Sequence, residues 1–295
     1  MSQQHRNTIF VEEAEILSHE SLDGGQQVLR VAAPKLAAHA VPGSFVHIQC
    51  DPQLAMRRPM SVMRVDAQAG WAEFLYKTVG KGTRLLAQKR VGDTISVLGP
   101  VGRGFEPDPA RPRALLIGGG VGIPPMVFLA ERLRRVRTYQ PFVLMGSEVP
   151  FPFPLRPSQI MLPGMPDGTI ACMPLMEDWG IASRLASLQG YAGCHDGYVT
   201  DLARAWLDAL DDASRQQVAI YSCGPTPMLK AVADLASAYE LPCQVCLEEF
   251  MACAVGGCAG CAVRVRDGDG QAMKRVCVDG PVFAADSVLW EALPH

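Results

Sequence analysis

The chain has 295 residues, of which 48% are hydrophobic and 19% charged, and its formal net charge at pH 7 is −3. A chain of this length and composition can bury a large core, so we expect two or three domains. The charge offers no basic field for nucleic acid, and a polar start at Met1–Arg6 with no long apolar run predicts no signal peptide, no membrane span and a cytoplasmic protein.

Short apolar runs broken by Gly, Pro and Asp occupy the first hundred residues. They lie at 8–18, 27–33, 44–50, 60–66, 71–78 and 94–98. Six short strands separated by turn residues predict an antiparallel β-barrel, with one helix at about 82–89. The proline-rich, charged stretch 106–113 then predicts a domain boundary, so we assign 1–106 to the barrel domain.

Two loops of the barrel domain carry residues suited to phosphate. In Arg57-Arg-Pro-Met-Ser-Val62 an arginine and a serine three residues later can reach one phosphate group, and in Gly80-Lys-Gly-Thr83 the glycines free backbone amides at a helix start. Taken alone, the Arg-Arg pair is more often a solvated surface; together the loops predict a pyrophosphate cradle. The candidate cofactor-binding residues here are Arg58, Pro59, Met60, Ser61, Tyr76, Lys77, Gly80, Lys81, Gly82 and Thr83.

The pattern after residue 111 is α/β. Residues 114–117 form a buried type of strand, 118–122 a tight glycine turn and 125–137 a helix with apolar residues at helical spacing. Further strands are predicted at 141–145, 168–173, 196–199 and 217–222, and helices at about 200–211 and 226–239. This alternation predicts a parallel sheet with helices on both faces over 111–243. Apart from the run 168–173, no element is assigned in the proline-rich segment of about 150–190.

Two glycine turns of this domain predict a dinucleotide site. The first turn lies between a buried strand and its helix, where the helix N-terminus can approach a diphosphate; the second, in Tyr221-Ser-Cys-Gly-Pro225, should lie beside it at the carboxyl edge of the sheet. The candidate residues are Gly118, Gly119, Gly120, Val121, Gly122, Cys223, Gly224 and Pro225. Cys223 would border the nicotinamide and is a candidate catalytic residue.

Two glutamates have both a functional and a plain interpretation. Glu148 follows the second strand of the sheet, where an acidic side chain would accept hydrogen bonds from a ribose diol and repel a 2′-phosphate, which favours NADH over NADPH. Glu248 is a second catalytic candidate, because it could touch the nicotinamide or tune a neighbouring redox group. Glu148 is explained equally well as a solvated surface charge, and a pair such as Glu248 and Glu249 is more often simply solvated.

Four cysteines near the C-terminus have a distinctive spacing. Cys253, Cys258, Cys261 and Cys277 form C-x4-C-x2-C, then fifteen residues and a fourth Cys, which is the plant-type pattern for a [2Fe–2S] cluster. Zinc and disulfides remain as alternatives, although structural zinc sites usually pair their ligands in two short units. The remaining cysteines, Cys223 excepted, are interpreted as small buried apolar residues. Residues 244–295 are assigned to a compact cluster module.

Taken together, these stretches resemble the ferredoxin–NADP reductase superfamily, and most closely the iron–sulfur electron-transfer subunit of the two-component, NAD-dependent dihydroorotate dehydrogenase. The resemblance covers nearly the whole chain, and its most specific part runs from Leu247 to Phe283. It implies that Arg58 and Ser61 belong to an FAD site, that the two glycine turns bind NAD(P)H, and that the four cysteines hold a [2Fe–2S] cluster. Two departures stand out: Met60 occupies a place that is aromatic in many reductases, and 147–195 is longer and richer in proline than expected.

The implied activity is electron transfer. Nicotinamide gives up two electrons as hydride, an iron–sulfur cluster accepts one at a time, and FAD can convert between them. We expect a catalytic flavoprotein subunit of the dihydroorotate dehydrogenase type as partner in a hetero-oligomer serving pyrimidine biosynthesis. Two alternatives stay open: the reductase subunit of another complex, of the sulfide dehydrogenase or hydrogenase type, and a non-catalytic structural protein that holds zinc.

Overall fold

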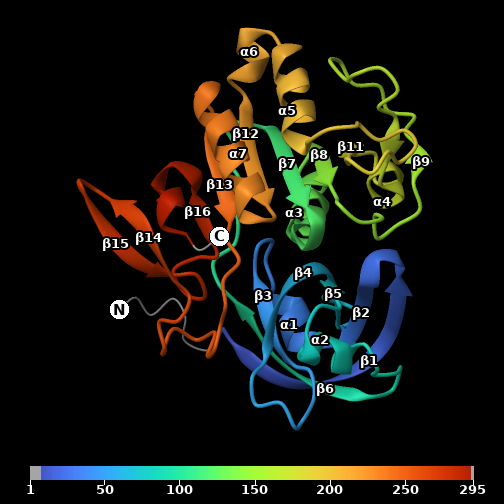
Figure 1. Ribbon diagram of the computed structural model, residues 1–295, viewed down its shortest axis with the longest axis vertical. Helices are drawn as coiled ribbons and strands as arrows, with labels where there is room; N and C mark the ends of the chain where they lie inside the picture. Colours follow the sequence, from blue (N-terminus) through green and yellow to red (C-terminus); the bar gives the residue numbers. More distant parts are fainter. Residues whose placement is uncertain (1–7, 294–295) are drawn as a thin grey trace.

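The computed structural model describes residues 8–293 of the chain, which form three structural parts in sequence order (Figure 1). An N-terminal barrel is followed by a mostly parallel sheet with helices, and a small C-terminal part packs beside both. The polar start Met1–Arg6, on which the expectation of no signal peptide rests, lies outside the described residues. None of the helices within 8–293 combines the length and apolar character needed to cross a membrane.

The first part is a closed barrel with strand order β1-β2-β5-β4-β3-β6, and every neighbouring pair is antiparallel. Its elements are β1 (Phe10–Leu22), η2 (Asp23–Gly25), β2 (Gln26–Ala32), α1 (Pro34–His39), β3 (Phe45–Gln49), β4 (Arg58–Asp66), β5 (Trp71–Lys77), α2 (Lys81–Leu86) and β6 (Thr94–Val101). Alternating apolar residues such as Val46, Ile48 and Phe74 fill the barrel. The prediction of a six-stranded antiparallel barrel with one helix at about 82–89 is confirmed, with a further short helix α1.

The second part is a six-stranded sheet of order β11-β8-β7-β12-β13-β16, parallel except for β16. Its elements from the α/β region are β7 (Arg113–Gly119), η3 (Gly120–Gly122), α3 (Ile123–Arg134), β8 (Gln140–Gly146), β9 (Arg156–Pro157), β10 (Ala171–Cys172), α4 (Pro174–Asp178), β11 (Ala182–Ala186), α5 (Val199–Asp208), α6 (Asp212–Arg215), β12 (Val218–Cys223), α7 (Thr226–Ala238) and β13 (Cys243–Cys246).

Successive residues of the central strand β7 face opposite sides of this sheet. Leu116 packs with α3 and Met145, whereas Leu115 and Ile117 pack with α5 and α7. Because each face of the sheet buries apolar side chains, helices must cover both. The predicted parallel sheet with helices on both faces is confirmed.

Two of the predicted parallel strands are wrong. The run 168–173 contributes only the two-residue strand β10, which pairs with β9 in a separate small sheet, and 196–199 is a loop that leads into α5. The fifth parallel strand is instead β11, which pairs with β8. It lies in the proline-rich segment 150–190 and was not predicted, because two of its five residues, Ser183 and Arg184, are polar although buried.

The C-terminal part consists of the hairpin β14 (Ala262–Asp267) and β15 (Gly270–Arg275), then β16 (Val282–Ala284), η4 (Ala285–Ser287) and η5 (Trp290–Ala292). Its core includes Val263, Val276 and Cys277 and extends to Phe45 and Val101 of the barrel. β16 pairs antiparallel with β13 and so becomes the edge strand of the large sheet. The C-terminal part is therefore fixed to both of the other two parts.

Candidate functional site

The two glycine turns meet at the carboxyl edge of the sheet, as expected. β7 and β12 are parallel neighbours, and Gly118 lies opposite Cys223 in their register. A side chain at Gly122 would collide with the Cys223 carbonyl, and a Cβ at Gly224 would lie 3.2 Å from the Gly119 nitrogen. Only glycine permits backbone to approach backbone this closely.

The first turn also presents a helix N-terminus. Gly120 has φ +54°, which glycine adopts without strain, and the chain then turns through η3 into the twelve-residue helix α3. Two prolines occupy the first turn of α3, where no amide donor is lost to the helix. The remaining free amides and the positive end of the helix dipole make this turn suitable for a diphosphate.

The two catalytic candidates lie in contact. Cys223 Sγ is 4.0 Å from Glu248 Oε1, and Cys246, the register partner of Cys223 on β13, hydrogen bonds to its thiol. That hydrogen bond and burial raise the pKa of Cys223, so the thiol is neutral. The Glu248 side chain reaches solvent, but the protein packed around it displaces much of the water near its carboxyl, and this desolvation raises the pKa to about 7.

The barrel loops also come together. Gly82 at the start of α2 lies against Arg58, since a Cβ there would sit 3.0 Å from the Arg58 Nε. Thr83 Oγ1 accepts hydrogen bonds from the amides of Val79 and Gly80 at 3.0 and 3.1 Å and so fixes the loop next to the guanidinium. Arg57, by contrast, binds Ser96 and the His47 carbonyl inside the barrel wall. Of the two arginines, Arg58 is the one placed for phosphate.

Other predicted residues of the barrel loops are placed differently from one another. Met60 and Tyr76 point into the barrel core, where the Tyr76 hydroxyl lies 2.9 Å from His19 Nε2. Ser61 is half-buried and Pro59 exposed, because they alternate with the core residues Met60 and Val62 along β4. Lys77 ends β5 and is half-buried, and Lys81 at the start of α2 is exposed.

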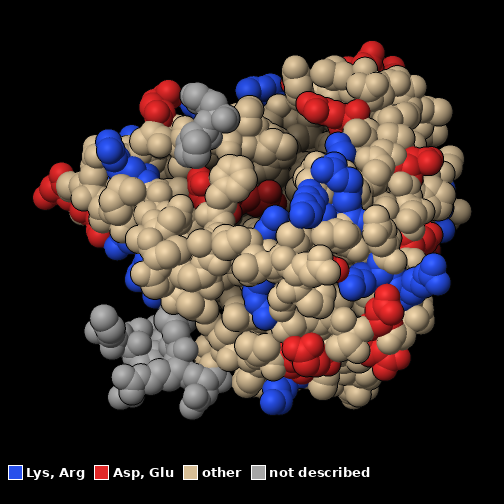
Figure 2. All heavy atoms as spheres, turned by 60° about the horizontal axis from the view of Figure 1, so that its bottom comes forward, with Lys and Arg blue, Asp and Glu red and all other residues tan. Residues whose placement is uncertain are grey.

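The barrel loops and the glycine turn belong to one region of the molecule. α3 packs on β4, the strand that begins with Arg58, and η3 contacts β5. Figure 2 shows a hollowed face with acidic atoms in the hollow and a row of Lys and Arg side chains beside it. The two nucleotide-binding regions expected from the sequence are thus held next to each other by one helix and one turn.

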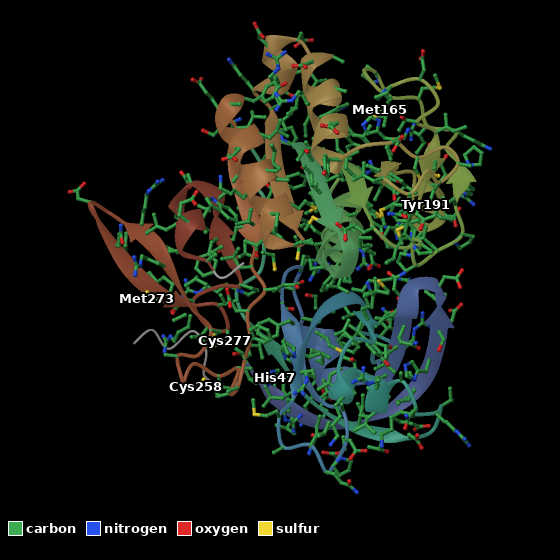
Figure 3. The ribbon with its side chains drawn as sticks, in the orientation of Figure 1. His47, Met165, Tyr191, Cys258, Met273 and Cys277 are labelled. Atoms are coloured by element: carbon green, nitrogen blue, oxygen red, sulfur yellow. The ribbon has the colours of Figure 1, made fainter. Side chains whose placement is uncertain are left out.

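The four C-terminal cysteines approach one another in two pairs. The thiol of Cys253 contacts that of Cys258, and Cys261 contacts Cys277. Cys261 and Cys277 are buried in the core that reaches the barrel, whereas Cys258 is exposed on the loop (Figure 3). Burial and a hydrogen bond with the Cys261 thiol raise the pKa of Cys277 to about 12.

The comparisons with known proteins agree with this geometry. Residues 248–289 match the model of the iron–sulfur cluster binding domain of dihydroorotate dehydrogenase B. The chain is 33% identical over 263 residues to the electron transfer subunit of dihydroorotate dehydrogenase B (NAD(+)) from Desulforamulus reducens, covering 88% of this chain and 90% of the relative. Against the same subunit of Bacillus caldolyticus it is 38% identical over 256 residues, covering 84% and 86%. The chain belongs to this family.

Solved structures place the fold of this family member among ferredoxin reductases. The structure of an NADH-dependent reduced ferredoxin-NADP oxidoreductase matches with a TM-score of 0.77 and 26% identity over 95% of this chain and 91% of that one. The ferredoxin reductase of carbazole 1,9a-dioxygenase has a TM-score of 0.61, with 21% identity over 79% and 67% of the two chains. The family match and this fold support FAD, an iron–sulfur cluster and NAD(H) as the cofactors expected from the sequence.

The thiols suit a two-iron cluster of this family better than a single metal ion. Within residues 8–293, no three His, Cys, Asp or Glu side chains converge on one metal position. In a [2Fe–2S] cluster each iron takes two thiolates, and the two pairs provide this arrangement. The chemistry of the donors and their two pairs therefore fit the cluster.

The loop between the first three cysteines is bent toward the sulfurs. Although burial opposes it, hydrogen bonds from the amides of Val255, Cys258 and Gly257 lower the pKa of Cys253 to about 7. Ala254 and Ala259 have φ of +57° and +55°, a conformation that costs L-residues about 1–2 kcal/mol each. Strain of this kind persists where the surroundings hold it, and here it turns successive amides inward to stabilise thiolate.

Two residues at the site were missed by the sequence interpretation. Cys246 was taken as an ordinary buried apolar residue, but β13 places it beside Cys223. Arg275 donates to the Gly256 carbonyl at 3.0 Å and pairs with Asp279, so it braces the cysteine loop from β15. Neither could be found from spacing, because each acts through a strand pairing or a loop contact between distant segments.

Proposed function

We propose that this chain carries electrons between NAD(H) and a partner flavoenzyme through FAD and a [2Fe–2S] cluster. The observation that carries the proposal is the segment from β13 to the cysteine loop. It begins beside Cys223, places Glu248 at 4.0 Å from that thiol, and reaches Cys253 five residues later. A single short stretch therefore connects the nicotinamide side of the site to the cluster side.

Different residues of the site would bind the cofactors and ligate the cluster. Arg58 and the Gly80–Thr83 loop would hold the FAD pyrophosphate, and the Gly118–Gly122 turn with Cys223–Pro225 would hold the dinucleotide against it. FAD supplies the conversion between two-electron and one-electron chemistry when bound. Glu248 and Cys223 would position the nicotinamide, and Cys253, Cys258, Cys261 and Cys277 would ligate the cluster.

The partner we infer is the catalytic subunit of a dihydroorotate dehydrogenase. The relatives named above are electron transfer subunits of that enzyme, and this chain matches them along most of its length. The C-terminal part also exposes apolar side chains: Phe250 and Val255, on the segment that carries Cys253 and Cys258, are 93% and 49% exposed, and Met273 on β15 is 60% exposed. Exposed apolar side chains grouped near a redox centre suit a docking surface through which electrons leave.

The test is reconstitution with separately purified subunits. The anaerobically isolated chain should contain FAD, iron and sulfide and should be reduced by NADH. Addition of the catalytic subunit and dihydroorotate should produce NADH from NAD⁺ only when both subunits are present. A chain that lacks iron and flavin would overturn the proposal, as would one that NADH does not reduce.

A second candidate is an electron-transfer subunit of a different complex, and one observation favours it. The solved structure with TM-score 0.77 is an NADH-dependent reduced ferredoxin-NADP oxidoreductase, which shares the fold along nearly the whole chain. In that case NADH would reduce the chain normally, but the dihydroorotate dehydrogenase subunit would neither bind nor receive electrons. The same reconstitution therefore separates the two candidates.

We also infer a preference for NADH over NADPH. Glu148 is exposed two residues beyond the end of β8, at the carboxyl edge where a ribose would lie. A carboxylate there accepts hydrogen bonds from a ribose diol and repels a 2′-phosphate. We expect kcat/KM with an artificial acceptor to be at least about tenfold higher for NADH, and Glu148→Ser to narrow the ratio. The same NADH-to-NADPH ratio of kcat/KM in the wild-type protein and in Glu148→Ser would contradict this role of Glu148.

A further inference from the structure

A second cleft lies at the opposite end of the large sheet from the glycine turns. It has a volume of about 670 Å³, and its lining includes the first residues of β7, β8 and β11: Arg113, Gln140 and Ala182. These are the amino ends of parallel strands, whereas the dinucleotide turns are at the carboxyl ends. The cleft is therefore separate from the site described above.

The outer wall of the cleft comes from the proline-rich segment to which the proposed function assigns no role. Leu162 and Trp179 of that segment line the cleft. Gly164 packs against Ala205 on α5, so the segment is held on the domain rather than projecting from it, and Figure 3 shows its Met165 next to that helix. The volume falls within the range of pockets that hold small organic ligands.

The charges of the lining are all of one sign. Arg113, Arg134 and Arg137 line the cleft and no Asp or Glu does. Among the described residues, none of these three guanidinium groups has an ion pair or a hydrogen-bond acceptor, although Asp211 lies near Arg113. The Arg113 Nε is buried without a partner. Buried donors without acceptors are rare in folded proteins and call for a bound group or water.

Most of the other lining residues are apolar, and four of them are aromatic: Tyr139, Phe142, Trp179 and Trp206. Trp179 and Tyr139 are half-buried at the cleft, and Arg134 lies over the Trp179 ring at 4.6 Å from its centroid. This contact holds the guanidinium in place while its N–H donors remain free. Arginine forks match phosphate oxygens, and aromatic walls match a planar ring.

We propose that this cleft binds a nucleoside phosphate, with the phosphate on the arginines and the base against the aromatic wall. Three guanidinium groups that form no ion pair suit a phosphate dianion better than a single carboxylate does. The arginines also lie near the C-terminal end of α3, whose partial negative charge they offset. Arg132 lies in the same last turn but does not line the cleft, which makes it a suitable control.

Calorimetric titration of the full-length holoprotein with UMP, AMP, inorganic phosphate and benzoate tests the proposal. We expect saturable binding of a nucleotide at least about tenfold tighter than that of phosphate or benzoate. Arg134→Gln and Arg137→Gln should each weaken it about tenfold or more, and Arg132→Gln should not. Arg137 is exposed and its side chain has no hydrogen bond or ion pair among the described residues, so its variant should fold even if loss of the Trp179 contact disturbs Arg134→Gln.

Several outcomes would overturn the proposal. Absence of saturable nucleotide binding at millimolar concentration is one. Another is binding that Arg134→Gln and Arg137→Gln leave unchanged, which would place the nucleotide at the carboxyl edge of the sheet. If phosphate bound as tightly as the nucleotides, the aromatic wall would not select the ligand. If benzoate did so, the arginine cluster would not select it.

Discussion

Glu248 links protonation to electron transfer at the scale of a single residue. Burial raises the pKa of its carboxyl to about 7, so the group is mostly neutral below that pH and mostly ionised above it. An ionised carboxylate beside Cys223 stabilises the positive charge that a nicotinamide ring acquires on giving up hydride. The rate of NADH oxidation by the wild-type chain should therefore rise as pH increases through about 7.

Glu248→Gln should remove this pH dependence and lower kcat by on the order of tenfold or more. Steady-state reduction of an artificial acceptor across pH 5.5–8.5, about three units around the inflection, is the measurement. Glu249→Gln, the neighbouring substitution, should keep the wild-type profile. An unchanged inflection in Glu248→Gln would show that another group titrates.

Arg58 is the residue on which we expect FAD retention to depend. Its guanidinium lies against the Gly82 turn, whereas Arg57 is committed to the barrel wall. Loss of a charge-assisted hydrogen bond to phosphate costs about 1.5–3 kcal/mol, so Arg58→Ala should bind FAD about tenfold or more weakly. Flavin fluorescence titration measures this loss, with the exposed barrel residue Arg90 changed to Ala as control. Equal FAD affinity in both variants would remove Arg58 from the site.

At the scale of an element, the cysteine loop depends on a brace from outside it. Arg275 holds the Gly256 carbonyl and pairs with Asp279. Because the ion pair between Arg275 and Asp279 is partly exposed, we expect Arg275→Met to destabilise the loop only slightly. The variant should then lose its cluster about fivefold faster than the wild-type protein when a chelator is added.

The decay of visible cluster absorbance under chelator measures this effect. Arg264→Met on β14 is the matched control, since Arg264 is an exposed arginine of the same hairpin. Equal decay rates for the two variants would mean that the loop is held by its own backbone alone.

Elements with an apolar signature could be predicted from the sequence, and those stabilised by distant polar contacts could not. The strand at Arg113–Gly119 and its glycine turn were predicted because a buried run and a tight turn adjoin. β11 was missed because its buried polar residues are satisfied elsewhere in the fold. Ser183 accepts the Met173 amide, and Arg184 donates to the Ile160 carbonyl. Hydropathy cannot show such partners.

The same limit explains the candidate site. The glycine turns and the cysteine quartet are local patterns whose chemistry dictates their spacing. Cys246 and Arg275 act by contacts made through the fold, with no motif of their own. The contact between Cys223 and Glu248 required β13 to lie next to β12, a pairing that the sequence did not predict.

At the scale of the whole molecule, Phe250 is the strongest candidate for contact with a partner. Its side chain is 93% exposed and lies between Glu248 and the cysteine loop. Truncating a central aromatic residue of an interface commonly costs about 2 kcal/mol or more, so Phe250→Ser should weaken binding of the catalytic subunit by about thirtyfold.

The affinity can be measured directly with the catalytic subunit immobilised on a surface and the wild-type or variant chain in solution. Met161→Ser is the control, because Met161 is 90% exposed but lies in the proline-rich segment far along the chain. NADH-driven reduction of an artificial acceptor should stay unchanged in both variants. If Met161→Ser weakened the complex and Phe250→Ser did not, the partner would dock on the other side of the molecule.

The return of the chain to the large sheet has a consequence for shortened forms of the protein. β16 follows all four cysteines and covers the edge of β13 that would otherwise be open. In a protein that ends at Leu247, β13 would be an exposed edge strand with apolar residues, and such edge strands pair with other chains. A chain shortened in this way by proteolysis or an early stop codon should therefore aggregate and should not act as a simpler NADH-oxidising flavoprotein. Loss of the cluster segment should thus abolish NADH oxidation as well.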